Sequence, residues 1–256
     1  MKKGPAPAPA ALTLAHPGAT RRALRHLKRT DPVLAKLIAE VGRCGYQLRA
    51  DGAHFDHIVR AIVYQQLAGK AAATIHGRVQ ALYGGRPPTP AELAGTRPAR
   101  LRRAGLSRQK LSYLRDLARG VASGRLGLDG LDGLPDEAVI EALTAIRGVG
   151  VWTAQMFLMF RLGRLDVLPV LDLGIQKGMQ RAYGLRRMPR PAEMERIAAG
   201  WSPYRSVACW YLWRAAERPD PGLRARPAPR VRSAARSRPA PPAHRAPRSR
   251  PKRRRA

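Results

Sequence analysis

Helical periodicity runs through the central part of the sequence and constrains the fold more than any other feature. Between Asp31 and Gly42, apolar residues fall on one side of a helix that Asp31 would cap. The same spacing predicts helices over residues 54–67, 71–83, 107–121, 135–146, 151–162, 172–183 and 203–217, and Thr89 is placed to cap a short one. Alternating apolar and polar runs with turn signals never exceed four residues. We therefore expect an all-α fold.

Composition divides the chain into three parts. Residues 1–30 are rich in proline and alanine, with seven basic and no acidic residues, and we expect them to be mostly disordered. Residues 31–218 carry the helical pattern and are expected to form the folded domain. Residues 219–256 contain nine prolines and thirteen basic residues, which predicts a disordered Arg/Pro-rich tail.

Positive charge is the most unusual bulk property of the chain. The 48 lysines and arginines, set against 17 acidic residues, give a formal net charge of +31. Residues 31–218 alone hold 28 basic and 16 acidic residues, so the excess is not confined to the ends. A basic folded region indicates a polyanionic partner, and nucleic acid is the leading candidate.

Cysteine content and hydropathy exclude several classes of protein. Cys44 and Cys209 are too few and too far apart for a disulfide framework, a zinc site or an iron–sulfur cluster, and we expect both to be ordinary buried thiols. The sequence has no run of about 18 apolar residues and no apolar stretch behind its first lysines. We therefore expect a soluble cytoplasmic protein, associated with the nucleoid if bacterial, with no membrane contact.

A Gly-x-Gly turn between two predicted helices is the most informative local motif. It lies in residues 143–154 as Arg147-Gly148-Val149-Gly150. Each glycine admits positive φ and lets a phosphate approach the backbone, while the following helix offers free N–H groups to the anion. Such a turn would hold a DNA phosphate without reading sequence. An ordinary helix C-cap and tight connection would give the same local pattern.

The hairpin and its downstream segment together resemble a known family. Ile146 to Ala154, followed by Asp166-Val167-Leu168-Pro169-Val170-Leu171-Asp172-Leu173-Gly174-Ile175, resembles the helix-hairpin-helix DNA glycosylase superfamily, and within it the DNA-3-methyladenine glycosylase II branch for alkylated bases. Supporting matches lie at residues 61–67, 105–110 and 201–208. The resemblance implies two helical subdomains flanking a base-binding cleft. With some 30 residues before the first expected helix, it indicates the short form, which lacks a preceding β-sheet domain.

The resemblance also implies an enzyme. Members of this branch flip alkylated purines out of duplex DNA and hydrolyse their glycosidic bonds, which starts base excision repair. Their catalytic aspartate matches Asp172, whose carboxylate would stabilise positive charge on the sugar and orient the attacking water. The alternative is that Asp172 only caps its helix, a common role that is compatible with catalysis. Asp166 lies off the matching position and is expected to be a loop or ion-pair residue.

Two departures from other branches narrow the chemistry. Glycosylases that also nick the backbone carry a lysine two residues after the second glycine, where this chain has Trp152, so we expect hydrolysis without lyase activity. Branches with an iron–sulfur cluster need four cysteines, so we expect neither a cluster nor another metal cofactor. In the family, hairpin carbonyls such as that of Val149 can hold a monovalent cation.

The resemblance further places candidate pocket residues. Trp152 and Trp213 match aromatic positions whose indoles would stack on a cationic purine. Tyr64 is another candidate, and Met156 stands where the family can show an aromatic residue. The alternative is that such residues belong to the core, which we keep as the interpretation of the other two tryptophans.

A side chain must fill the hole that a flipped base leaves. The resemblance assigns this wedge to Gln66 or its neighbours Gln65 and Leu67, and the alternative is that the glutamines are only the polar side of a helix. Arg147 replaces a proline common in the family and could add a phosphate contact.

The expected partner is double-stranded DNA with damaged bases, bound by a monomer. One alternative is a glycosylase for oxidised or deaminated bases, which the aromatic pocket argues against. Another is a non-catalytic helix-hairpin-helix DNA-binding protein, which would have no use for Asp172 or for an aromatic pocket.

Overall fold

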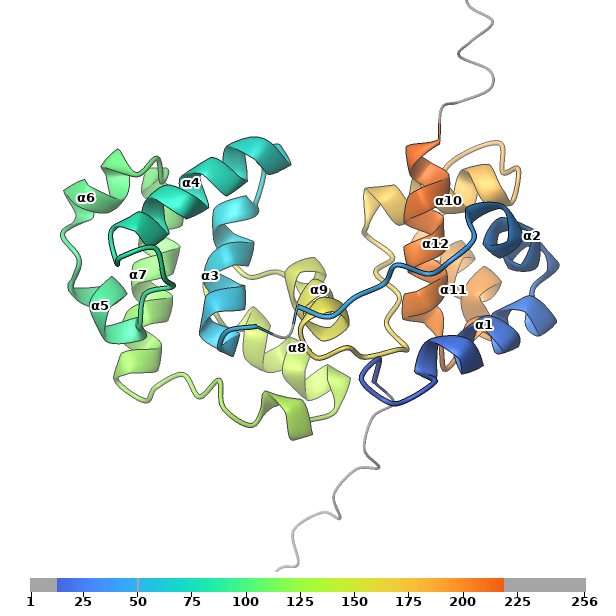
Figure 1. Ribbon diagram of the computed structural model, residues 1–256, viewed down its shortest axis with the longest axis horizontal. Coiled ribbons are helices and arrows are strands. Elements are labelled where there is room, and N and C mark those ends of the chain that lie inside the picture. The colour runs from blue at the N-terminus through green and yellow to red at the C-terminus, as the bar shows by residue number, and fades with distance from the viewer. Residues whose placement is uncertain (1–12, 50, 219–256) are drawn as a thin grey trace, which may run out of the picture. The chain divides into compact units, whose positions relative to one another are not determined.

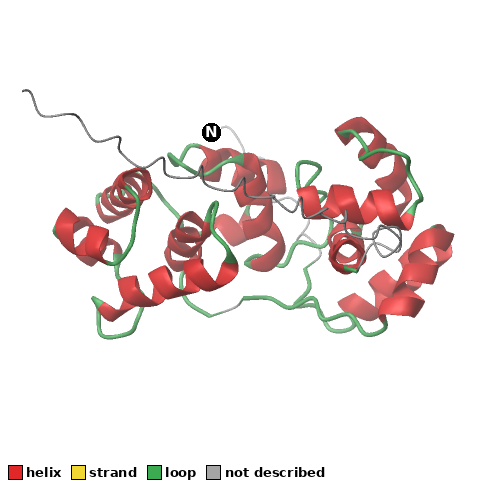
Figure 2. Cartoon of the chain, turned by 90° about the horizontal axis from the view of Figure 1, so that it is seen from above, coloured by secondary structure: helices red, strands yellow, loops and turns green. Residues whose placement is uncertain are grey.

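The computed structural model describes residues 13–49 and 51–218, and this part of the chain is built of helices (Figure 1; Figure 2). Its β-type pairing is limited to an isolated bridge between Thr13 and Arg164. The expected all-α class is therefore confirmed for the described residues. No helix among them is long and apolar enough to cross a membrane.

Twelve α-helices and two short 3₁₀-helices make up this part of the chain. In chain order they are α1 (Ala19–Thr30), α2 (Pro32–Val41), α3 (His54–Tyr64), α4 (Gly69–Ala81), α5 (Pro90–Gly95), α6 (Pro98–Arg103), α7 (Arg108–Ala122), η1 (Leu131–Gly133), α8 (Asp136–Thr144), α9 (Val151–Phe160), α10 (Leu173–Ala182), α11 (Pro191–Ala198), η2 (Ala199–Trp201) and α12 (Arg205–Glu217). Every helix predicted from periodicity has a counterpart here. Helices α1, α6 and α11 were not predicted.

Helix α1 corrects the expectation that residues 1–30 are mostly disordered. Ala19, Ala23 and Leu27 recur at four-residue spacing and are buried, and the helix packs against α2, η2 and α12. Average composition hid this stripe, because two of its three residues are small alanines between basic neighbours. Residues 1–12 and the tail at 219–256 lie outside the described residues.

Contacts divide the helices into two groups, as the expected pair of subdomains requires (Figure 1). Helices α1, α2, α10, α11 and α12 form one group, and helices α3 to α9 form the other. In the first group, a Cβ atom at Gly178 of α10 would lie 2.0 Å from the carbonyl oxygen of Leu212 in α12. Only glycine fits this contact, which fixes α10, and Asp172 at its start, against α12.

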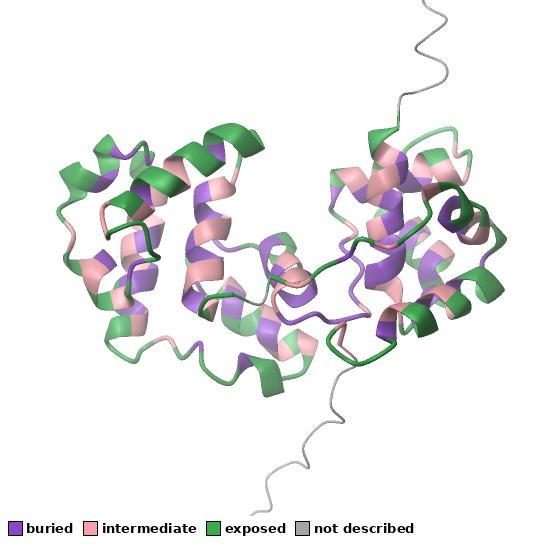
Figure 3. Cartoon of the chain, viewed as in Figure 1, coloured by how far each residue is buried: buried purple, intermediate pink, exposed green. Residues whose placement is uncertain are grey.

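The connector between α9 and α10 is irregular in conformation but largely buried (Figure 3). Ser206 of α12 satisfies much of its backbone. Its hydroxyl donates to the carbonyl oxygen of Arg164 at 2.7 Å and accepts the N–H of Val167 at 3.0 Å, and its own N–H donates to the Leu165 carbonyl at 2.9 Å. Buried irregular backbone needs such partners. Helix α12 thus holds the segment that leads to Asp172.

The two cysteines are free thiols that differ in burial. Cys209 is buried as expected, whereas Cys44 is only half-buried. Burial raises the pKa of both thiols. Both are therefore protonated and unreactive at neutral pH.

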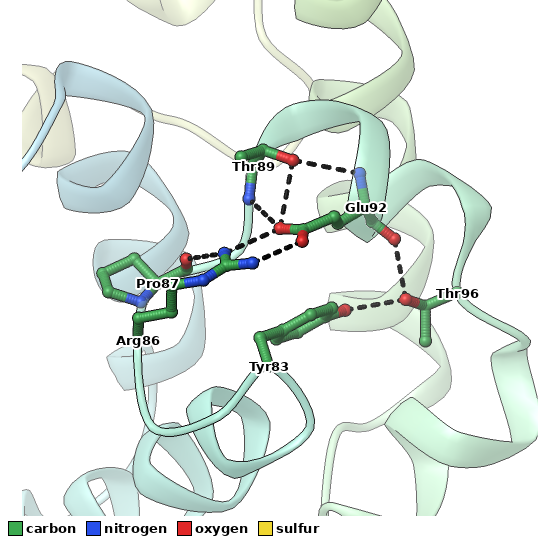
Figure 4. A network of polar contacts seen from close by, with 6 residues as sticks. All are labelled: Tyr83, Arg86, Pro87, Thr89, Glu92 and Thr96. Atoms are coloured by element: carbon green, nitrogen blue, oxygen red, sulfur yellow. Dashed lines mark hydrogen bonds and ion pairs between the residues drawn. The ribbon is translucent and has the colours of Figure 1, made fainter.

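An exposed network caps α5 (Figure 4). The Thr89 hydroxyl accepts the N–H of Glu92 at 3.3 Å, and the Glu92 carboxylate accepts the N–H of Thr89 at 2.8 Å. Arg86 donates to the two carboxylate oxygens at 2.8 and 2.5 Å. The Arg86 hydrogen bonds, followed by the backbone bond from Thr89, lower the pKa of Glu92 to about 2. The prediction that Thr89 caps a short helix is confirmed.

Candidate active site

The glycine hairpin joins α8 to α9. Gly148 has φ +88°, and a Cβ atom there would come within 2.2 Å of the Tyr113 ring, so this position requires glycine on two counts. Gly150 has φ −97°, so only Gly148 of the two hairpin glycines uses the positive φ that glycine admits. A Cβ atom at Gly150 would meet no protein atom within 4 Å. Its open side leaves room for an anion at the start of α9.

Arg147, on the hairpin, is exposed but docked on helix α7. Its guanidinium donates to the hydroxyl of Ser112 and lies 5.7 Å from the centre of the Tyr113 ring. Tyr113 therefore contacts both Arg147 and Gly148. These contacts tie the conformation of the hairpin to α7.

Asp172 accepts hydrogen bonds from two other residues expected in the site, Trp152 and Trp213. Its side chain is 8% exposed and caps α10, with Oδ1 accepting the N–H of Ile175 at 2.8 Å. The indole N–H of Trp213 donates to the same oxygen at 2.9 Å, and the indole N–H of Trp152 donates to Oδ2 at 2.8 Å. The carboxylate of Asp172 therefore both caps α10 and lies in the candidate site.

Trp213 reaches Asp172 from α12 because the second residue of α10 is Gly174. A Cβ atom at Gly174 would lie 2.8 Å from Cδ1 of Trp213 and 3.1 Å from Oδ1 of Asp172. The Trp213 ring stacks on Phe160, with centroids 5.7 Å apart and planes inclined by 28°. Trp213 therefore bridges the two groups of helices, with its polar edge on the carboxylate and its face on α9.

A cavity of about 760 Å³ lies between α3 and α9. Six residues expected in the site line it: Tyr64, Gln65, Gln66, Val149, Trp152 and Met156. Leu67, the other candidate for the wedge, lines it as well. Asp172 and Trp213 are not in its wall. They adjoin it through their contacts with Trp152 and Phe160, both of which line the cavity.

The turn after α3 differs from the expected helix over residues 54–67. The helix ends at Tyr64, and Gln66 has φ +55°, a left-handed conformation that is uncommon for a residue other than glycine. Gln65 and Gln66 therefore do not lie on the polar side of a helix, and that alternative is wrong. Leu67 is partly exposed beside them.

Two long side chains hold this turn in place. The side-chain amide of Gln65 donates to the carbonyl oxygen of Gly148 at 2.8 Å, which links the turn to the hairpin. The ammonium group of Lys110 donates to the carbonyl oxygens of Val63 at 2.7 Å and Gln65 at 2.6 Å. Burial lowers the pKa of Lys110. Lys110 lies in the matching block at residues 105–110, but its sequence context indicates no role.

Several residues that line the cavity were not predicted from the sequence. Arg49, Arg60 and Arg161 line the cavity together with His57 and Phe160. Arginines on a helix, or next to one, usually extend into solvent, so nothing in their spacing marked them as cavity residues. Burial lowers the pKa of His57, with smaller contributions from the neighbouring arginines, so this imidazole is neutral at pH 7.

Two side chains expected to be structural are so. Trp201 is fully buried, and its indole N–H donates to Asp31. Asp166 forms an ion pair with Arg205, with Nε and Oδ1 2.7 Å apart. Among the described residues, no group of three or more His, Cys, Asp or Glu side chains could hold a metal ion.

Comparison with known proteins gives one family and a consistent set of relatives. Residues 59–203 match the family described as HhH-GPD superfamily base excision DNA repair protein. The alkylbase DNA glycosidase-like protein mag2 of Schizosaccharomyces pombe is 30% identical over 196 residues, which cover 75% of this chain and 92% of that protein.

Two solved structures share the fold along most of their length. The DNA-3-methyladenine glycosidase of Bacillus halodurans superimposes with a TM-score of 0.68 at 40% identity, covering 80% of this chain and 92% of the other. The 3-methyladenine DNA glycosylase of S. pombe, solved in complex with abasic DNA, gives a TM-score of 0.70 at 32% identity, covering 75% and 95%.

Proposed function

This chain belongs to the HhH-GPD superfamily of base excision DNA repair proteins, and we propose that it is a monofunctional glycosylase that removes alkylated purines from double-stranded DNA. The observation that carries this proposal is the carboxylate of Asp172, held by the indoles of Trp152 and Trp213 beside a cavity large enough for a purine. The names of the relatives, which are alkylbase and 3-methyladenine glycosylases, support the substrate class.

Asp172 would act on the sugar rather than on the base. When the glycosidic bond breaks, positive charge develops on the sugar ring, and a fixed carboxylate stabilises it without having to reorient. Oδ1 already accepts two hydrogen bonds, whereas Oδ2 accepts one, from Trp152. Because a carboxylate oxygen can accept two, Oδ2 keeps one site for the attacking water or for the charged sugar.

DNA would be gripped on both sides of the flipped nucleotide. The open N-terminus of α9 at Gly150 suits a backbone phosphate, and the exposed Arg147 adds positive charge to the same turn. The cavity wall includes the turn after α3, which is formed by Gln65, Gln66 and Leu67. A side chain from this turn would fill the gap in the base stack, and Gln66, which is exposed and has a left-handed backbone conformation, is our choice for the wedge.

The product would be an abasic site in an uncut strand. Trp152 occupies the position at which lyase-type relatives carry a lysine, and an indole cannot form a Schiff base. We also propose that the enzyme acts as a monomer and needs no divalent metal ion, so that a chelator leaves its rate unchanged. A monovalent cation at the hairpin carbonyls remains part of this proposal.

The function is tested by incubating methylated duplex DNA with the purified protein and quantifying the free bases. We expect released methylpurines, and strands that break only after alkali treatment. Binding without release would indicate a non-catalytic DNA-binding protein. Release of only oxidised or deaminated bases from defined duplexes would point to another lesion class, and breakage without alkali would contradict the monofunctional assignment.

The basic tail would add affinity without adding chemistry. Residues 219–256 carry thirteen basic residues, enough to contact several phosphates. Deleting them should weaken DNA binding and flatten its salt dependence, while the single-turnover rate stays nearly the same. A large drop in that rate would give the tail a part in catalysis.

A further inference from the structure

The cavity that would receive the flipped base carries an unexpected charge. Arg49, Arg60 and Arg161 line it, and its lining contains no aspartate or glutamate. Asp172 is not part of this lining, and its carboxylate already has three hydrogen-bond donors. The lining therefore carries positive charge, although the natural substrates of an alkylation-repair enzyme include purines that carry a positive charge themselves.

Two of the arginines lie on aromatic rings of the cavity wall other than that of Trp152. The guanidinium carbon of Arg60 is 4.0 Å from the centre of the Tyr64 ring. That of Arg49 is 5.7 Å from the centre of the Phe160 ring, whose other stacking partner is Trp213. These cation–π contacts use the ring faces that could have attracted a cationic purine.

Both guanidinium groups stay charged at neutral pH, because arginine is not deprotonated in proteins. Burial lowers the pKa of Arg49, and the charge of Arg60 lowers it further, so each of the two cations is within electrostatic reach of the other. His57 does not change the charge of the cavity wall, since its imidazole is neutral. A third cation entering this space would be repelled by both arginines.

Cleavage of the glycosidic bond changes the charge of the base, so a positively charged cavity wall would affect neutral and cationic purines differently. When the bond between the sugar carbon C1′ and the base nitrogen breaks, the electron pair stays on the base, and water adds a hydroxyl group to the sugar and supplies a proton. A cationic purine leaves as a neutral molecule, whereas a neutral purine leaves with negative charge until it is protonated. Guanidinium groups stabilise that negative charge and can donate hydrogen bonds to ring nitrogens and carbonyl oxygens.

We propose that Arg49 and Arg60 determine lesion specificity by making the cavity favour electrically neutral alkylated purines over positively charged ones. This inference rests on the proposed glycosylase function and reverses the cation–π selectivity expected from the sequence. An alternative role for the same arginines is contact with DNA phosphates, which would favour no lesion over another.

The test compares two defined duplexes under single-turnover conditions. One contains a single 1,N6-ethenoadenine, which is neutral, and the other a single 7-methylguanine, which is cationic. The measured quantity is the ratio of the two release rates, each corrected for uncatalysed loss. A ratio does not depend on the fraction of active protein, so partial misfolding of a variant does not obscure it.

Arg49→Met and Arg60→Met remove charge with little change in side-chain length, and the corresponding lysine variants retain it. We expect the ratio to shift toward 7-methylguanine by about tenfold or more in the double methionine variant, and by less in the double lysine variant. Arg78→Met, at an exposed position on α4 outside the cavity, is the matched control and should leave the ratio unchanged.

An unchanged ratio in the double methionine variant overturns the proposal, whether both rates fall together, as lost phosphate contacts would cause, or neither falls. A wild-type protein that releases both bases with the opposite preference overturns it as well, while leaving the glycosylase function standing. Release of neither base by the wild-type protein would remove the proposed function, and this inference with it.

Discussion

Asp31 and Asp172 are two nearly equivalent aspartates in different surroundings. Each is buried, with 9% and 8% of its surface exposed, and each caps the helix that follows it. Each also accepts an indole N–H at 2.8 Å through Oδ2, from Trp201 in the case of Asp31 and from Trp152 in the case of Asp172. Local capping chemistry therefore does not distinguish Asp31 from Asp172, the carboxylate that we propose to be catalytic.

The difference lies in the partners of the two carboxylates. Trp201 is fully buried, and the hydroxyl of Tyr183 donates to the same oxygen of Asp31 at 2.5 Å, so Asp31 is enclosed by fixed donors within one group of helices. Trp152 is 42% exposed and lines the cavity, and Trp213 comes from a different helix from Asp172. One carboxylate holds helices together, and the other binds a tryptophan that lines the cavity.

Asparagine at position 172 should produce the largest effect. Its amide can still cap α10, but it has lost the charge that would stabilise the sugar, so we expect single-turnover base release to fall by about 10³-fold with little change in Tm. Trp152 is partly exposed and can turn away from the new amide. Equal release by wild type and Asp172→Asn would remove this residue from the mechanism.

The same substitution at position 31 should have the opposite outcome. An amide there faces the buried indole N–H of Trp201, which has no access to water, so we expect a loss of about 2 kcal/mol in the free energy of unfolding. The rate per folded molecule should stay within twofold of wild type. Thermal and urea unfolding, together with base release, measure both quantities, and a comparable loss of rate at both positions would break the comparison.

Trp213→Phe should show how much the second indole contributes to the orientation of Asp172. The substitution removes the donor to Oδ1 but keeps a ring to stack on Phe160. We expect base release about tenfold slower, since a hydrogen bond to a charged group is lost. Trp210→Phe, on the same helix but in contact with Tyr211 and Arg214 instead, is the control and should retain the wild-type rate.

Lys110→Met should affect base flipping more than chemistry. Without the ammonium group, the carbonyl oxygens of Val63 and Gln65 lose their donor, and the turn that presents Gln66 loosens. We expect kcat/KM to fall about fivefold, mainly through KM, with weaker fluorescence of a 2-aminopurine placed beside the lesion. Lys70→Met, an exposed variant on α4, should change neither. A drop confined to kcat would argue against a positioning role.

Glu92, in the exposed cap of α5, is a third carboxylate for this comparison, and its substitution should give the smallest effect. The pKa of Glu92, lowered to about 2 by Arg86 and then by Thr89, means that its contribution to stability is complete above pH 4.5 and is lost as the pH falls toward 2. Glu92→Gln should therefore lower Tm slightly at pH 7 and not at all near pH 2. A Tm difference that grows on acidification would contradict this assignment.

Much of the fold follows from local sequence. Apolar spacing, capping residues and prolines predicted the helices that carry the site, because a helix depends mainly on residues within one turn of each other. The hairpin at Gly148 and the cap at Asp172 were identifiable for the same reason. Helix α1 was missed because its buried stripe consists largely of alanine, which signals burial only when the packing partner is known.

Which residues meet in space depends on how the helices pack. The sequence alone singled out Asp172, Trp152 and Trp213, but not that both indoles donate to one carboxylate, because their separations in sequence of 20 and 41 residues place no limit on distance in space. Nor did it show that the exposed Arg49 and the half-buried Arg60 line the same cavity. That shared position comes from packing between helices rather than from any one segment.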